Sequence, residues 1–138
     1  MTKAENIAFM NANPNCHLAT MEGNKPHVRG MMIYRADENG IIVQASTPKD
    51  LHKQLLKNPE VELCFNSYKE GIQVRVSGKM ELINDRALKE EILAKRQFLK
   101  PWVDKNGIDF LVVYRLSKGI ANVWTRQVNF NPKVYIEL

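Results

Sequence analysis

A strict alternation of apolar and polar residues over 72–82 constrains the fold of this chain more than any other feature. Successive side chains of a β-strand point to opposite faces, so the pattern predicts one long strand with a single buried face. That face would carry Ile72, Val74, Val76, Gly78, Met80 and Leu82. Shorter stretches of strand composition lie at residues 16–21, 26–35, 41–46, 60–66, 109–116, 119–125 and 133–137.

Short turns join the first of these strands. Residues 22–24 read Glu-Gly-Asn and residues 37–40 read Asp-Glu-Asn-Gly, which are typical turn compositions. Strands joined by such turns pair antiparallel, because parallel pairing needs a long crossover. The mostly sequential order therefore predicts a mainly β fold, an antiparallel barrel closed so that no sheet edge is left unpaired.

Helices are expected around this barrel. The first covers residues 2–12, where the apolar residues have helical spacing. The second spans 47–58, with Thr47 as its N-cap, and the third spans 85–99, with Asp85 as its N-cap. These helices would be peripheral attachments to the barrel.

The composition predicts one soluble domain over residues 1–138. Hydrophobic residues make up 44% of the chain and charged residues 25%, as in ordinary globular domains. No stretch approaches the ~18 apolar residues that a membrane helix needs, and the first residues lack the apolar region of a secretory signal. We therefore expect a cytoplasmic protein without a membrane partner.

The thiol and imidazole groups give no sign of a metal site. Cys16 and Cys64 form no C-x-x-C pair and are interpreted as reduced core thiols. His17, His27 and His52 have neither a helical i, i+4 partner nor a nearby cluster of carboxylates. No bound metal is expected.

The charge balance favours a small anionic ligand over nucleic acid. The net charge is +5, but the 20 Lys and Arg residues are dispersed along the chain. No basic run and no aromatic-rich RNA-binding signature is present, so no nucleic-acid partner is expected. No glycine-rich phosphate loop is present either, and any phosphate must be held by side chains and a helix start.

The start of the second helix is one candidate for that role. Ser46 and Thr47 lead into it, and Lys49 and Lys53 add positive charge. The alternative is structural: Thr47 caps its own helix, and Asp50 already supplies the negative charge that a helix start favours.

Arg29 is a second candidate, on the same strand face as His27 and Met31. An arginine inside a small barrel or at its rim can bind an anion through two hydrogen bonds, although a strand arginine usually just faces solvent. Gln73 allows the same two interpretations. Trp102 and Trp124 have the alternatives of stacking on a ligand or packing in a core or interface.

Taken together, these residues resemble a known family. The run from Pro26 to Arg29, the strand end at Ser46 and Thr47, the helix end at Asn58 and Pro59, and QVRVSGK at 73–79 are similar to the pyridoxamine 5′-phosphate oxidase-like FMN-binding split-barrel family. The likeness covers roughly residues 15–83, and more faintly 109–125. It implies a six-stranded antiparallel split β-barrel with peripheral helices, and a homodimer with FMN at the subunit interface.

The resemblance also implies roles for individual residues. Arg29, with Met31 on the same strand face, corresponds to the strand arginine that contacts the phosphate and ribityl chain of FMN. Ser46 and Thr47 match the strand end that reaches the cofactor. Gln73 and Trp124 match residues that approach the flavin from the partner subunit.

Three departures from the family pattern shape the functional prediction. Leu51 stands where a lysine is frequent, so Lys49 or Lys53 would neutralise the phosphate. Tyr34 replaces a lysine of the oxidase itself, and the R-x-H-x-D-R segment that grips its substrate is absent from 125–138. The chain therefore resembles the short members of the family, and pyridoxamine phosphate oxidase activity is not expected.

The leading hypothesis is a flavoprotein that passes electrons or hydride between NAD(P)H and a small oxidised acceptor. Hydride transfer to the ring requires no acid or base residue, so no catalytic residue is assigned. The alternatives are a non-catalytic FMN carrier, a split barrel that binds haem or deazaflavin F420, and a ligand-free structural or nucleic-acid-binding barrel.

Overall fold

A computed structural model describes residues 1–138 and shows ten strands in two antiparallel sheets. The larger sheet, in the order β10-β9-β6-β5-β1-β2, contains β1 (Asn15–Glu22), β2 (Lys25–Met32), β5 (Glu60–Ser67), β6 (Ile72–Lys79), β9 (Ile120–Thr125) and β10 (Tyr135–Glu137). The smaller, in the order β3-β4-β8-β7, contains β3 (Arg35–Asp37), β4 (Gly40–Ser46), β7 (Glu81–Ile83) and β8 (Leu111–Leu116). The predicted mainly β, antiparallel architecture is confirmed, and the larger sheet has six strands. The predicted closure without unpaired edges is wrong, because both sheets are open and β2 and β10 are the edge strands of the larger one.

Two strands that the sequence predicts as continuous are each divided between the two sheets. The 72–82 strand becomes β6 and β7, and the 26–35 strand becomes β2 and β3. At the first break Met80 is buried, and its N–H donates to the carbonyl of Pro59. The chain changes sheets there, so the alternation does not continue: Leu82 is 52% exposed, and its predicted place on the buried face is wrong.

Four α-helices and three short 3-10 turns complete the chain: α1 (Lys3–Ala12), α2 (Asp50–Lys57), α3 (Arg86–Lys95), α4 (Lys100–Asn106), η1 (Gln97–Leu99), η2 (Ile108–Phe110) and η3 (Arg126–Val128). Asp85 caps α3 as predicted, because its side chain accepts from the Leu88 N–H. The predicted end at Leu99 is wrong, since α3 stops at Lys95 and a separate helix, α4, follows.

The predicted N-cap of the second helix is also wrong. Lys49 occupies the N-cap position of α2 and makes no side-chain capping bond. The backbone N–H of Thr47 instead donates to the carbonyl of Phe110 at 3.1 Å. This contact holds the end of β4 beside the segment that precedes β8. The helix therefore begins only at Asp50.

The main hydrophobic core lies between the two sheets and beneath α1. Phe65, Leu18, Leu63, Val74 and Val76 are fully buried within it. A smaller cluster packs beneath α3 and contains Ile42, Leu88, Ile92, Leu111 and Val113. Strand β4 is covered on both faces, which explains why residues 41–46 lack polar alternation.

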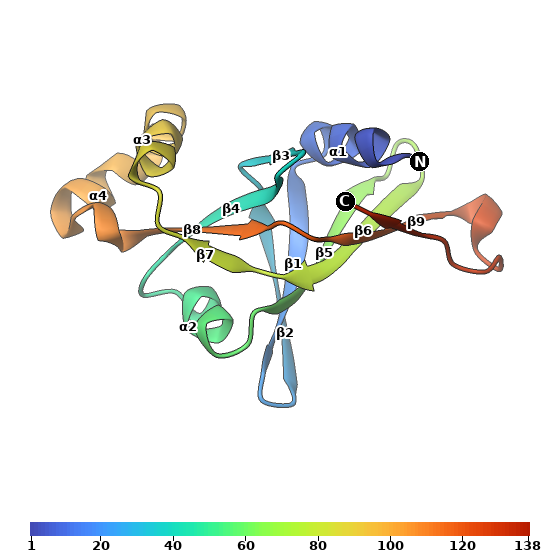
Figure 1. Cartoon of the computed structure of the whole chain (residues 1–138), viewed down its shortest axis with the longest axis horizontal. Helices are drawn as coiled ribbons and strands as arrows, with labels where there is room; N and C mark the ends of the chain where they lie inside the picture. Colours follow the sequence, from blue (N-terminus) through green and yellow to red (C-terminus); the bar gives the residue numbers. More distant parts are fainter.

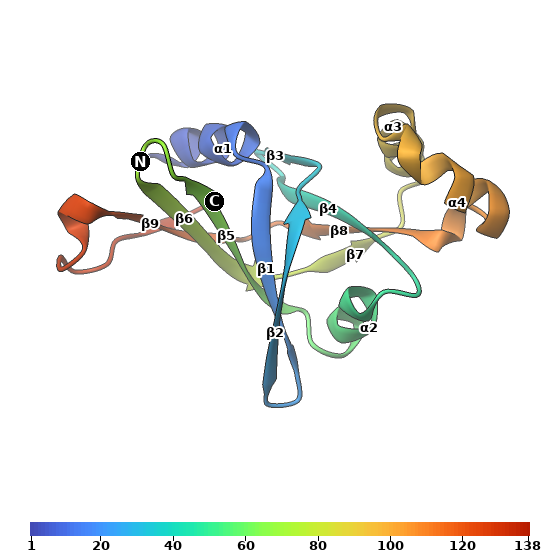
Figure 2. The ribbon, with the colours of Figure 1, turned by 180° about the vertical axis from the view of Figure 1, so that it is seen from behind.

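The ribbon shows where the peripheral elements lie. In Figures 1 and 2, α3 and α4 occupy one end of the molecule, and the connection between β9 and β10 extends from the other. Helix α2 lies beside β1 and β4, on the opposite side of the barrel from α1. None of the helices combines the length and the apolar character needed to cross a membrane.

The two cysteines are both free but differ in burial. Cys16 is buried and Cys64 is half-buried, so only Cys16 is the core thiol that the sequence predicts. Burial raises the pKa of Cys16 to about 12, with a further contribution from Cys64. A thiol with so high a pKa is inert as a nucleophile at neutral pH.

Candidate functional site

A cavity of about 700 Å³ lies between the outer edge of β2 and the beginning of α2. We call it the arginine cavity. It is lined by Glu22, His27, Val28, Arg29, Gly30, Met31, Met32, Gln44, Lys49, Asp50, Leu51, Gln54, Arg96 and Phe98. Its volume lies within the range of about 300–1,000 Å³ that is usual for ligand sites.

Arg29 is held in place by a buried hydrogen-bond network. Its Nη1 donates to the Thr20 hydroxyl at 2.8 Å and to the Leu18 carbonyl at 3.2 Å, and its Nη2 donates to Gln54 Oε1 at 2.6 Å. The Thr20 hydroxyl also donates to Gln54 Oε1, at 2.6 Å. Three of the five guanidinium N–H groups are thus engaged, which fixes the side chain and leaves two donors for a ligand.

A second arginine, Arg96, reaches the same cavity from the C-terminal end of α3. It donates to Gln44 Oε1 and to the carbonyls of Ile33, at 2.7 Å, and Met32. It therefore ties the end of β2 to β4. Sequence reasoning missed Arg96, because it lies in a segment predicted as the polar face of one helix and no local motif marks it.

The cavity carries a small positive excess. Arg29, Lys49 and Arg96 are three cations against two carboxylates, Glu22 and Asp50, which leaves one positive charge with His27 taken as neutral. Burial lowers the pKa of the Arg29 and Arg96 guanidinium groups, and nearby Asp50 partly offsets this effect for Arg29. Two partly desolvated arginines favour an anion at this place.

An apolar cavity of about 430 Å³ adjoins the first. We call it the aromatic cavity. It is lined by Gln44, Ala45, Ser46, Pro48, Lys49, Phe98, Leu99, Trp102, Val103, Phe110 and Leu111. Gln44, Lys49 and Phe98 line both cavities, so the two are continuous. Most of the segment from Trp102 to Gly107 is α4, and it forms one wall of this cavity.

The structure brings together four of the eight residues predicted to bind a cofactor. Arg29, Met31 and Lys49 line the arginine cavity, and Ser46 lines the aromatic cavity together with Lys49. Thr47 is exposed beside them and lines neither cavity. Lys53 is exposed on α2 and also lies outside both.

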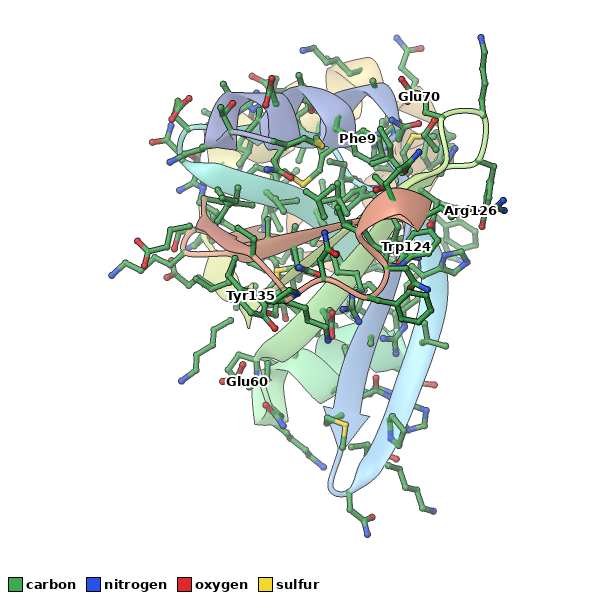
Figure 3. All side chains as sticks on the ribbon, turned by 90° about the vertical axis from the view of Figure 1, so that its right-hand side faces the viewer. Phe9, Glu60, Glu70, Trp124, Arg126 and Tyr135 are labelled. Atoms are coloured by element: carbon green, nitrogen blue, oxygen red, sulfur yellow. The ribbon has the colours of Figure 1, made fainter.

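Gln73 and Trp124 lie elsewhere, next to each other on the large sheet. They are paired across β6 and β9, and Gln73 Nε2 donates to Asn66 Oδ1 at 3.0 Å. Trp124 Nε1 donates to Asn129 Oδ1 at 2.8 Å. Figure 3 shows Trp124, near the end of β9, close to Arg126, the first residue of η3. These two residues do not meet Arg29 within one chain.

The outer face of the large sheet connects these two regions. The Val28 and Met32 side chains on β2 are 69% and 47% exposed, and both line the rim of the arginine cavity. The strand register places Gln73 in the same row as Asn66 and Trp124 on the exposed face of the sheet. Because β2 is the edge strand, the cavity opens around that edge towards this face.

The structure offers no metal centre. No three histidine, cysteine, aspartate or glutamate side chains come together in an arrangement that could hold an ion. The only histidine in the arginine cavity is His27, which lies 3.6 Å from Glu22. The other polar side chains that line the arginine cavity are cations, amides and the carboxylates of Glu22 and Asp50.

Solved structures show the same fold. A NimC/NimA family protein from Clostridium acetobutylicum is 24% identical and superimposes with a TM-score of 0.79, covering 98% of this chain and 92% of that one. An FAD-binding protein from Mesorhizobium loti is 16% identical with a TM-score of 0.67, covering 89% and 94%. These likenesses confirm the predicted six-stranded split β-barrel.

Sequence comparison gives the family. A pyridoxine/pyridoxamine 5′-phosphate oxidase of Rhizobium meliloti (strain 1021) is 23% identical over 112 residues, which are 79% of this chain and 54% of that protein. The chain thus spans about half the length of this curated relative. The sequence matches the family described as pyridoxamine 5′-phosphate oxidase over residues 2–110. The split barrel with its arginine cavity therefore belongs to the pyridoxamine 5′-phosphate oxidase family.

Proposed function

We propose that the arginine cavity binds FMN and that the protein is a homodimeric flavin-dependent oxidoreductase. The observation that carries this proposal is the fixed guanidinium of Arg29, with two free N–H donors, in a cavity of about 700 Å³ that also contains Lys49 and Arg96. An arginine donates hydrogen bonds in fixed directions, and a lysine carries its charge on a flexible side chain. Together they recognise a phosphate monoester well. Family membership and the FAD-binding neighbour support a flavin as the carrier of that phosphate.

The residues present fit the phosphate end of FMN. Arg29 would donate to the phosphate through its free N–H groups, and Lys49, which takes part in no ion pair within the chain, would neutralise it. Lys49 lines the cavity and Lys53 does not, so Lys49 is the lysine assigned to this role. Ser46, at the end of β4, lines only the adjoining aromatic cavity and is not assigned to the phosphate.

The open rim at β2 favours a second copy of the chain as the missing wall. Val28 and Met32 leave an exposed apolar edge there, and Trp124 and Tyr135, 39% and 60% exposed, extend the apolar character across the same sheet face. A homodimer through this face would cover these side chains. It would also allow Gln73 and Trp124 of the partner subunit to reach the cofactor that Arg29 holds.

Bound FMN would supply two-electron redox chemistry, and the protein would bind it, orient it and leave one face accessible. We propose that electrons or hydride pass from NAD(P)H to a small oxidised acceptor. Arg29 and Lys49 would hold the phosphate, the partner's Gln73 would offer a hydrogen-bond donor towards the ring, and the partner's Trp124 would exclude water from that side.

The test is titration of the purified protein with FMN and with riboflavin, followed by NAD(P)H oxidation assays with several acceptors. FMN binding at least tenfold tighter than riboflavin binding, with turnover of NAD(P)H, would support the proposal. Equal affinity for the two flavins would show that the arginine cavity does not hold the phosphate. Tight FMN binding without turnover on any donor would favour a flavin carrier.

A further inference from the structure

The aromatic cavity has features of a binding site that the phosphate of a cofactor does not explain. Trp102 and Phe110 stack with their rings nearly parallel, at 12°, and their centroids 6.4 Å apart. Together they form a flat aromatic wall. Leu99 and Val103 add apolar surface from the same helical segment, and Pro48 closes the side towards α2.

Its charge differs sharply from that of the arginine cavity. Lys49 is the only charged residue that lines it, and Lys49 is shared with the arginine cavity. With that lysine paired to a phosphate, the remaining polar groups are the neutral Gln44 and Ser46. A second anion would find no partner there, and desolvating it would be costly. The cavity therefore selects against charged ligands.

Two aromatic side chains of this cavity are left largely uncovered within the chain. Phe98 is 69% exposed and Trp102 is 57% exposed, although both line a concave apolar surface. Flat aromatic rings bind well to such surfaces, because they stack in offset geometry and displace water. The volume of about 430 Å³ is ample for a molecule of one or two fused rings.

We propose that the aromatic cavity binds the electron acceptor, and that this acceptor is an uncharged, flat aromatic molecule of one or two rings. The word "acceptor" and the neutrality of the ligand rest on the proposed function, because there a phosphate neutralises Lys49, whereas the apolar binding site itself does not. Continuity through Gln44, Lys49 and Phe98 places the bound ring next to whatever occupies the arginine cavity. Trp102 provides the stacking surface, and Phe98 lines the boundary between the two cavities.

The experiment is calorimetric titration of 2-naphthol, an uncharged two-ring probe, into the FMN-loaded protein and into the protein freed of flavin. Trp102→Ala should weaken 2-naphthol binding at least tenfold and leave FMN binding unchanged within twofold. Val103→Trp, which fills the cavity, should have the same effect. Phe130→Ala is the matched control, because Phe130 is 95% exposed and lines neither cavity. It should change neither affinity.

Each outcome separates this inference from the proposed function. If FMN fails to bind but the flavin-free protein binds 2-naphthol in a Trp102-dependent manner, the aromatic site stands and the flavin proposal falls. If 2-naphthol competes with FMN, or if Trp102→Ala weakens FMN binding, the aromatic cavity is part of the cofactor site and the inference is overturned. It is also overturned if 2-naphthol does not bind, or if Trp102→Ala changes only the oligomeric state.

Discussion

The arginine cavity and the aromatic cavity share three residues, yet they are built in opposite ways. The first is organised by hydrogen bonds, because Thr20 and Gln54 fix Arg29 and backbone carbonyls fix Arg96. The second is organised by apolar contacts, including the stacked Trp102 and Phe110. The residues at the end of β4 thus lie between the arginine cavity, which favours an anion, and the aromatic cavity, which favours an apolar ring. The variants below test whether that separation holds.

The largest expected effect distinguishes packing from binding within the arginine cavity. Leu51 lines the cavity, but it is 6% exposed and belongs to the main core. Leu51→Ala should lower the free energy of unfolding by ~2–5 kcal/mol, because it leaves a void in a packed core. Urea unfolding measures this loss. An unchanged unfolding midpoint would mean that Leu51 belongs to the ligand site and not to the core.

Arg29→Ala should show the opposite pattern to Leu51→Ala, with weaker FMN binding and little loss of stability. It should lower FMN affinity by ~1.5–3 kcal/mol, because a charge-assisted contact to phosphate is lost. The fold should remain intact, and 2-naphthol binding in the aromatic cavity should not change. Fluorescence titration with FMN, alongside riboflavin as the ligand without phosphate, gives the comparison. Equal losses of affinity for both flavins would show that Arg29 does not contact the phosphate.

Gln54 tests whether fixing Arg29 matters for binding. Gln54→Leu leaves the Thr20 hydroxyl and one Arg29 N–H without their shared acceptor, and should weaken FMN binding by ~1 kcal/mol. Gln54→Glu should weaken it further, because the new carboxylate would compete with the phosphate for Arg29. The two variants are compared by FMN titration. If Gln54→Glu binds FMN as tightly as the wild type, the network does not orient Arg29.

The smallest effect concerns the contact that ties α2, a wall of the arginine cavity, to β8. His52 Nδ1 lies 2.6 Å from the Tyr114 hydroxyl, and burial lowers the pKa of His52. The unfolded chain then binds the proton more readily than the folded one. Stability is therefore complete above the pKa of the unfolded histidine, about 6.5, and falls as the pH drops below it.

His52→Gln should remove this acid-side loss, as measured by unfolding midpoints between pH 7.5 and 5. The matched control is His17→Gln, because His17 is exposed on the large sheet. It should keep the wild-type pH profile. A His52→Gln profile identical to that of the wild type would show that the contact between α2 and β8 carries no pH dependence.

Local patterns predicted the strands because strands depend on nearby residues. Alternation located β5 and β6, and composition with a turn signal located β1. The family resemblance proposed Arg29 together with Lys49 or Lys53, and the structure places Arg29 and Lys49 in one cavity. The change of sheet at Met80 escaped prediction, since alternation does not reveal where a strand leaves one sheet for another.

The remaining site residues depend on tertiary contacts. Arg96 enters the arginine cavity only because α3 ends at Lys95, and the local sequence allowed the helix to continue to Leu99. Trp102 and Phe110 become one wall through packing of α4 against the turn that follows it. Thr47 has a good N-cap side chain, but its backbone bond to Phe110 prevails over that local preference.

The most direct test of the central claim is an absorption spectrum of the purified native protein, repeated on the supernatant after heat denaturation. The account predicts flavin bands that move into the supernatant with a compound of the mass of FMN. A colourless protein that also fails to take up added FMN would contradict it. So would a Soret band, which would assign the barrel to haem.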